Sequence, residues 1–184
     1  MNETFGLFLE NILPANIVLI YSLGVLVSFV ETDRVRPSLI KGVKFALAIL
    51  FAGIFGWIIV DFIGVEFKFL AAWVFFLVSL MAIIILQYLG ELNGDFYGLP
   101  KLFLFLPTLV GFQWLLLERS LVFNDMIATV FANALGFYVA FVLIATLKEQ
   151  MRISEASDIF KLAPAILIGL GIAAMGVAGF SFLY

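Results

Sequence analysis

Four polar side chains near two prolines are the residues best placed to do chemistry within the long apolar stretches of this chain. They are Glu10, Asn11 and Asn16 around Pro14, and Gln113 after Pro107. A proline removes one helical hydrogen bond and kinks or breaks the helix, and membrane proteins satisfy the freed carbonyl with protein or a water-lined cavity. We expect Glu10 at the outer interface. We expect Asn16 and Gln113 to bond carbonyls released at the prolines; both residues and both prolines are also candidates for an ion path.

The composition excludes most other chemistry for this chain by itself. It has no Cys and no His, so it lacks thiolate ligands, disulfides and the commonest metal ligand and general base. No Gly-rich strand-to-helix turn is present that could hold a nucleotide phosphate. The net charge of -3 argues against nucleic acid as a partner, because nucleic-acid binders normally carry a basic face. We therefore predict no catalytic and no metal-binding residues here.

The elements that position these residues are expected to be transmembrane helices. Of the 184 residues, 65% are hydrophobic and 12% are charged, which is far from the usage of a soluble domain. Six apolar segments are each long enough to span a bilayer. They are Phe5 to Val30, Val43 to Gly64, Phe69 to Leu89, Leu102 to Leu121, Met126 to Leu147 and Leu162 to Leu183. The prediction is an all-α integral membrane protein with a single domain, 1–184.

An internal repeat is suggested by the two prolines. Leu13-Pro14 and Leu106-Pro107 lie 93 positions apart, each in the first helix of a three-helix set. Halves of three helices have opposite orientations in the membrane, so halves of about 1–92 and 93–184 would form an inverted repeat. Interrupted helices in corresponding positions of such halves are typical of a midplane site. Two coincidental kinks are the alternative.

The distribution of basic residues predicts the orientation. With six spans, eight of the ten Lys and Arg residues fall on one side, and only Lys68 and Arg119 fall on the other. The eight are Arg34, Arg36, Lys41, Lys44, Lys101, Lys148, Arg152 and Lys161. The positive-inside rule makes their side cytoplasmic, so both termini should face outward.

Small residues at helical spacing predict close helix packing, either within the chain or against another subunit. The stripes are Ala48, Ala52 and Gly56; Ala128, Ala132, Gly136 and Ala140; and Gly169, Ala173, Ala174 and Ala178. The 22 Phe residues are expected to cover surfaces that face lipid or other subunits.

Four motifs, in order and at matching spacing, resemble the paired six-helix membrane subunits of the Rnf and Na⁺-translocating Nqr electron-transport complexes. In the first helix they are Asn16, Leu19 and Leu23-Gly24, and in the fourth Phe105-Leu106-Pro107. After the fifth helix come Leu147, Glu149, Met151 and Ser154, with Lys148 and Arg152 as basic equivalents. The last helix carries Pro164, Leu167, Ile168, Gly171, Ala174, Gly179, Phe180 and Ser181. The predicted orientation resembles the A-type subunit of Rnf and the E-type subunit of Nqr.

The resemblance implies an inverted-repeat subunit in a bacterial or archaeal cytoplasmic membrane, paired with a paralogue of opposite orientation. In the family an iron-sulfur centre lies between the two, and each subunit contributes two Cys. Those positions are occupied here by Leu26 and Gln113. Leu has no donor atom and an amide oxygen is a poor iron ligand. We therefore expect no cofactor bound by this chain and a structural or ion-path role as a non-catalytic subunit of a membrane oxidoreductase, in contact with lipid and other subunits.

A second function remains open on the sequence alone. The paired prolines with nearby polar residues also fit a small-solute or ion transporter, or a channel, on an inverted-repeat scaffold. The shortage of charged residues inside the predicted spans argues against it.

Overall fold

The protein is almost entirely helical. The computed structural model describes residues 3–32, 34–63, 69–90, 94–96, 98–119, 121–153 and 163–179. The elements are α1 (Glu3–Ile12), α2 (Val25–Glu31), α3 (Val35–Ile63), α4 (Ala71–Tyr88), β1 (Asp95–Phe96), β2 (Leu99–Pro100), α5 (Leu102–Glu118), α6 (Phe123–Ile153) and α7 (Ala163–Ala178). The two short strands pair antiparallel, with Asp95 opposite Pro100. The predicted helical class is confirmed, with this small hairpin as an addition.

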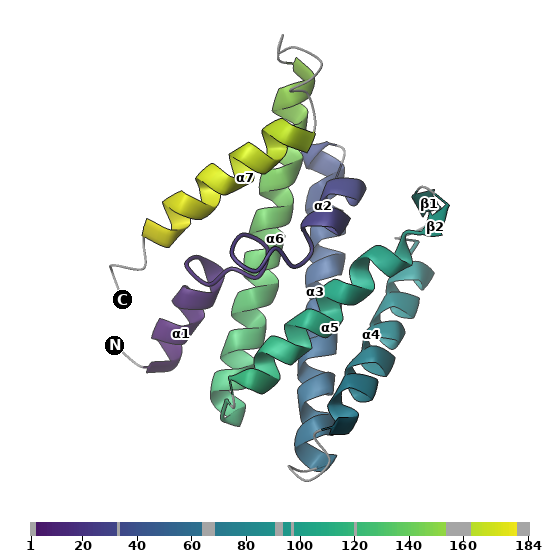
Figure 1. Ribbon diagram of the computed structural model, residues 1–184, viewed down its shortest axis with the longest axis vertical. Helices are drawn as coiled ribbons and strands as arrows, with labels where there is room; N and C mark the ends of the chain where they lie inside the picture. Colours follow the sequence, from purple (N-terminus) through teal and green to yellow (C-terminus); the bar gives the residue numbers. More distant parts are fainter. Residues whose placement is uncertain are drawn as a thin grey trace.

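Helices α3 and α6 form the centre of the bundle and pack along each other (Figure 1). Helices α4 and α5 pack against α3, while α1 and α7 pack against α6. The small-residue stripes of both central helices lie inside the bundle, since Ala52, Ala132 and Ala140 are completely buried. Packing within the chain is therefore confirmed for the stripes of α3 and α6. The α7 stripe is more exposed, and its Ala178 lies on the surface.

Aromatic rings fill the centre of the bundle, which corrects in part the expectation that Phe covers the outer surface. Phe45, Phe105, Phe137 and Phe141 are all fully buried. Phe45 meets Phe105 edge to face, with ring centroids 4.9 Å apart, and lies 5.4 Å from Phe141. The Ala and Gly residues of α3 and α6 leave room for these large rings, and such edge-to-face pairs add to the stabilisation from burial.

Two helices extend well beyond the predicted apolar segments. Helix α3 begins at Val35, before the predicted start at Val43, with Pro37 in its first turn, where the missing N–H costs no helical bond. Helix α6 continues past Leu147 to Ile153. Charged residues continue a helix readily outside the apolar region, so hydropathy marks the span and not the helix end. Gly64, Lys68, Ser154, Lys161, Leu162, Phe180, Ser181 and Leu183 lie outside the described residues.

Three of the described helices, α3, α4 and α6, are long and apolar enough to cross a membrane. Two further apolar helices are shorter, at Phe103–Glu118 and Pro164–Ala178. The predicted first span, Phe5 to Val30, is not one helix, because α1 and α2 are separated by the irregular segment 13–24. The membrane character of the chain is thus supported by three full-length helices among the described residues, and the count of six spans stays a prediction.

The two prolines have different effects. Pro14 lies in the irregular segment 13–24, so the predicted break is present there. Pro107 lies inside the continuous helix α5, so of the predicted kink or break the break is absent there. Pro107 is exposed and lies near the start of α5, where packing against α3 and α4 holds the helix together despite one missing hydrogen bond.

Candidate functional site at the helix break

Asn16 organises the irregular segment between α1 and α2. Its amide Nδ2 donates to the carbonyls of Ile12 and Gly136, both at 2.9 Å. Its Oδ1 accepts from the backbone amides of Val18 and Leu19, at 2.9 and 3.2 Å. The side chain is 1% exposed. One asparagine therefore replaces several of the lost helical hydrogen bonds and ties the break to the middle of α6. The Glu10 carbonyl, which Pro14 itself leaves free, is not among its acceptors, so the predicted partner of Asn16 is wrong in this detail.

The rest of the segment is less completely bonded. The Ala15 amide donates to the Glu10 carbonyl at 2.7 Å, which satisfies the group that Pro14 leaves free. Ser22 and Gly24 both have left-handed backbone conformations, with φ of 57° and 87°. The carbonyls of Leu19, Ile20 and Tyr21 accept no hydrogen bond from any residue in the described part of the chain. Because Ile20 and Tyr21 are exposed, these backbone groups lie at a surface of the bundle.

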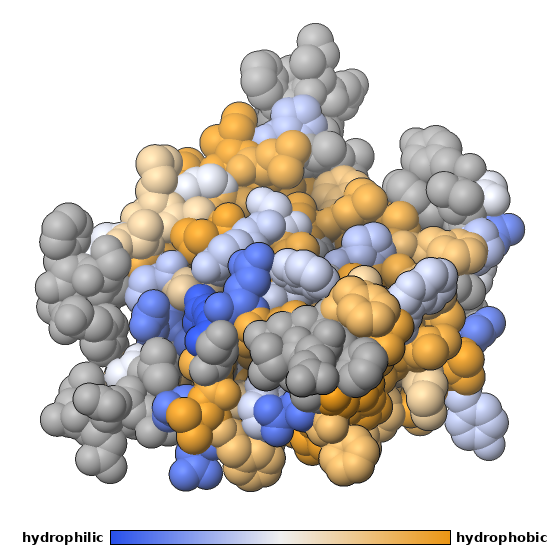
Figure 2. All heavy atoms as spheres, turned by 60° about the horizontal axis from the view of Figure 1, so that its bottom comes forward, coloured by the Kyte–Doolittle hydropathy of each residue, from blue (hydrophilic) through white to orange (hydrophobic). Residues whose placement is uncertain are grey.

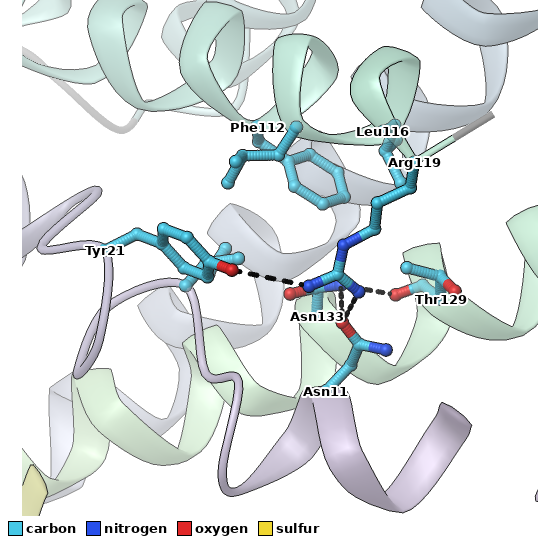
Figure 3. Close-up of a pocket in the computed structure, with 9 residues that line it drawn as sticks. Asn11, Tyr21, Phe112, Leu116, Arg119, Thr129 and Asn133 are labelled. Atoms are coloured by element: carbon cyan, nitrogen blue, oxygen red, sulfur yellow. Dashed lines mark hydrogen bonds between the residues drawn. The ribbon is translucent and has the colours of Figure 1, made fainter. Parts of the chain in front are cut away.

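A second polar group joins α1, the end of α5 and α6 (Figure 3). Arg119 Nη1 donates to Asn11 Oδ1 at 2.7 Å, and Nη2 lies 3.5 Å from the Tyr21 hydroxyl. Asn133 Nδ2 donates to the same Asn11 oxygen at 3.2 Å and to the Thr129 carbonyl at 2.8 Å. The sequence placed Arg119 on the outer side of the membrane and did not single out Asn133. The sequence did contain a signal for Asn133, since an asparagine in the middle of a long apolar stretch is rare.

Gln113 belongs to a third polar contact, between α5, α4 and α3. Its Nε2 donates to Ser79 Oγ at 2.8 Å, to the Leu109 carbonyl at 3.1 Å and to the Phe75 carbonyl at 3.4 Å. The Phe103 carbonyl, which Pro107 leaves free, is not among these acceptors, so the predicted partner of Gln113 is wrong. Its Oε1 lies so close to Gly56 that a Cβ there would be 2.0 Å away. Gln113 links helices and does not repair a break.

Charged side chains hold α2, which follows the irregular segment, in place. Lys148 of α6 donates to the carbonyls of Phe29 and Thr32, at the end of α2, and its Nζ lies 4.7 Å from the Phe29 ring centre. Buried Glu31 forms ion pairs with Lys41 and Lys101, both at 3.1 Å. A cation is favourable at a helix C-terminus because the last carbonyls carry partial negative charge. These contacts fix α2 to α3, α6 and the start of α5.

The residues at the two family cysteine positions do not fit an iron-sulfur cluster. Leu26 has no donor atom and is 53% exposed on α2, while Gln113 is 1% exposed and turns its amide toward α4. Thiolates are the usual ligands of such clusters. Within the described residues, no three His, Cys, Asp or Glu side chains are grouped as metal ligands.

Comparison with known proteins gives one consistent result. The chain is 24% identical over its whole length to the A-type subunit of the ion-translocating oxidoreductase complex of Pectobacterium atrosepticum, covering 98% of that protein. The proteins of the same name from Sodalis glossinidius and Buchnera aphidicola subsp. Baizongia pistaciae are each 25% identical, and the chain covers 98% and 96% of them. The chain is a distant, full-length relative of the A-type Rnf subunits. The family resemblance drawn from the four motifs is thereby confirmed.

No family model matches the chain. The A-type Rnf relatives share its whole length, so the similarity includes the broken first segment, the central pair α3 and α6 and helix α7. The polar contacts at Asn16, Arg119 and Gln113 are the candidate functional features of this chain.

Proposed function

We propose that this chain is a six-span membrane subunit of an Rnf-like, ion-translocating electron-transport complex, and that it pairs there with a paralogous subunit of opposite orientation. Its relatives carry names that place them in such a complex, over the full length of this chain. The broken first segment would provide one span, and α3, α4, α5, α6 and α7 the others. The chain acts structurally or in the ion path and supplies no ligands to a redox centre.

The observation that carries the proposal is the set of unpaired carbonyls at Leu19, Ile20 and Tyr21 among the described residues. Asn16 ties this segment to Gly136, which lies near the middle of the 31-residue helix α6 and hence near the middle of a membrane. Irregular backbone at that depth cannot face lipid, because each unsatisfied group there costs several kcal/mol. A partner subunit covering the break would shield or bond these carbonyls.

The outer surface is consistent with a membrane setting. Figure 2 shows apolar side chains over most of the visible described surface, with hydrophilic side chains in one group left of the centre and a few others toward the lower and right edges. Exposed Leu26 and Ile20 extend this apolar character to the face that contains the break. A partner helix of similar apolar character fits there.

An inverted repeat gains support from a pair of matching contacts. Asn16, in the first helix of the first half, packs its amide against Gly136, in the middle helix of the second half. Gln113, in the first helix of the second half, packs its amide against Gly56, in the middle helix of the first half. Two halves related by a two-fold axis in the membrane plane are expected to make reciprocal contacts of this kind. Half 1–92 and half 93–184 would be related by that axis.

The proposed location is a bacterial or archaeal cytoplasmic membrane with both ends of the chain outside. In Figure 1 the start of α3, the end of α6 and the β1-β2 hairpin lie toward one end of the molecule. That end carries Arg34, Lys101 and Arg152, in agreement with the positive-inside rule. The start of α1 and the end of α7 lie away from it.

The test is purification of the tagged chain from its native membranes in a mild detergent. We expect other complex subunits to co-purify, among them a six-helix paralogue identified by mass spectrometry. Leu26→Trp, beside the break, should release that paralogue, because added bulk does not fit a packed interface. The matched control is Leu77→Trp on α4, where Leu77 is 59% exposed and Leu26 is 53% exposed. Equal retention of the paralogue by both variants would contradict the proposed interface.

Two further measurements separate the proposal from its alternatives. Iron analysis and electron paramagnetic resonance of the purified complex should give no cluster signal assigned to this chain, and iron bound directly at it would contradict the cluster-free role. The chain reconstituted alone in vesicles should not transport ions or solutes. Uptake by the isolated chain would favour the transporter alternative.

A further inference from the structure

We propose that the small cavity below Arg119 is a binding site for one ordered water molecule that completes the polar junction of α1, α5 and α6. The cavity has a volume of about 10 Å³ and is lined by Asn11, Thr129 and Asn133 on its polar side and by Phe112 and Leu116 on its apolar side (Figure 3). A single water molecule needs a space of about 10–15 Å³.

Two buried acceptor atoms need this water. Asn133 Oδ1 and Thr129 Oγ1 have no hydrogen-bond partner within the described chain, although Asn133 is 3% and Thr129 1% exposed. The orientation of the Asn133 amide is fixed by its other end, since Nδ2 faces two acceptors, Asn11 Oδ1 and the Thr129 carbonyl. A buried oxygen without a donor is costly, and ordered water is the usual remedy.

The residues that line the cavity favour a neutral ligand that donates hydrogen bonds. A cation would meet the positively charged Arg119 guanidinium, which binds Asn11 at 2.7 Å on the edge of the same cavity, and like charges repel each other. An anion would face the Asn133 Oδ1 acceptor, which cannot donate. Water donates to both orphan oxygens and fits the volume. The cavity therefore favours water over an ion.

The test is whether one substitution lowers or raises the Tm of the full chain purified in detergent. Thr129→Val keeps the shape of the side chain and removes only the hydroxyl. If water bonds that hydroxyl, the variant should lose about 2–4 °C in Tm. If the hydroxyl is an unpaired buried group, its removal should leave Tm unchanged or raise it, which would overturn the proposal.

The control is Ser38→Ala, which removes a buried hydroxyl that has no partner in the described chain and does not line this cavity. A lower Tm for Thr129→Val than for Ser38→Ala supports the water site, and the reverse order contradicts it. An independent check is a high-resolution map of the protein. A density peak within hydrogen-bond distance of both oxygens supports the site, and an empty cavity refutes it.

Discussion

Asn16 Nδ2 lies 2.9 Å from the Gly136 carbonyl and joins the broken first segment to the middle of α6, 120 residues away in the chain. Gly136 has no side chain to hold the backbones apart, and a Cβ there would lie 2.8 Å from Asn16 Nδ2 and 3.2 Å from the carbonyls of Asn11 and Ile12. A glycine and an asparagine thus form one contact. A substitution at each of the two residues tests it separately.

Asn16→Ala should destabilise the folded chain strongly. The change removes four hydrogen bonds and leaves the amides of Val18 and Leu19 without their acceptor. With about 1–3 kcal/mol for each buried group left unsatisfied, we expect a loss on the order of 3 kcal/mol. Thermal unfolding followed by circular dichroism measures it. The control Asn124→Ala, at an exposed asparagine of α6, should change the stability by less than about 0.5 kcal/mol. Similar effects of both variants would refute the organising role of Asn16.

Gly136→Leu should prevent normal packing of α1 against α6 and so prevent assembly. The added side chain would collide with backbone carbonyls of α1, which cannot move away as a flexible side chain can. Size-exclusion chromatography and the yield of intact complex report the effect. Gly171→Leu on α7 is the matched control, since nothing lies within 4 Å of a Cβ at that position. An intact Gly136→Leu complex with unchanged thermal stability would show that the contact is dispensable.

Gly56 and Gln113 should be energetically coupled. Gly56→Ala places a methyl group 2.0 Å from the present position of Gln113 Oε1 and should cost about 1–3 kcal/mol. In the Gln113→Ala background the same change should cost less by about 1 kcal/mol or more, because the shorter side chain leaves space. A double-mutant cycle of unfolding free energies measures this coupling. Additive effects would mean that the two residues do not restrict each other.

Gln113→Ala should affect stability more than transport. The change removes the bonds to Ser79 and Phe75 that join α5 to α4, and the bond to the Leu109 carbonyl within α5. We expect a loss of about 1–3 kcal/mol in stability, with ion throughput per assembled complex within a few-fold of the unmodified protein. Transport assays normalised to the amount of complex decide the matter. Complete loss of transport in a normally assembled complex would place Gln113 in the ion path.

Lys148→Met should loosen the end of α2. Methionine retains much of the apolar stem but cannot donate to the carbonyls of Phe29 and Thr32 or interact as a cation with the Phe29 ring. A charge-assisted hydrogen bond contributes about 1.5–3 kcal/mol, so we expect a loss in that range and faster hydrogen exchange in residues 25–31. Lys44→Met, at a lysine whose bond to the Leu89 carbonyl is exposed, should have a smaller effect. Unchanged exchange in α2 would contradict the anchoring role of Lys148.

Several features of the fold could be predicted from the sequence because they depend on local physical properties. Runs of apolar residues predicted the long helices α3, α4 and α6, and Pro14 predicted the break. The small residues of α3 and α6 predicted close packing. Helix ends were placed less well, since Val35 to Gly42 and Lys148 to Ile153 continue their helices beyond the apolar region. Hydropathy cannot mark such ends.

The sequence by itself determined that this is a helical membrane protein without thiolate chemistry, because composition alone fixes which donors exist and which solvent the helices require. Only the tertiary structure decided what each polar residue does. Pro14 and Pro107 have the same local sequence context, Leu-Pro, yet the first interrupts a helix and the second does not. The difference lies in the neighbours: Asn16 and Gly136 satisfy the open backbone at the first proline, while α3 and α4 hold α5 continuous at the second. Contacts of this kind join residues far apart in the chain and cannot be read from spacing.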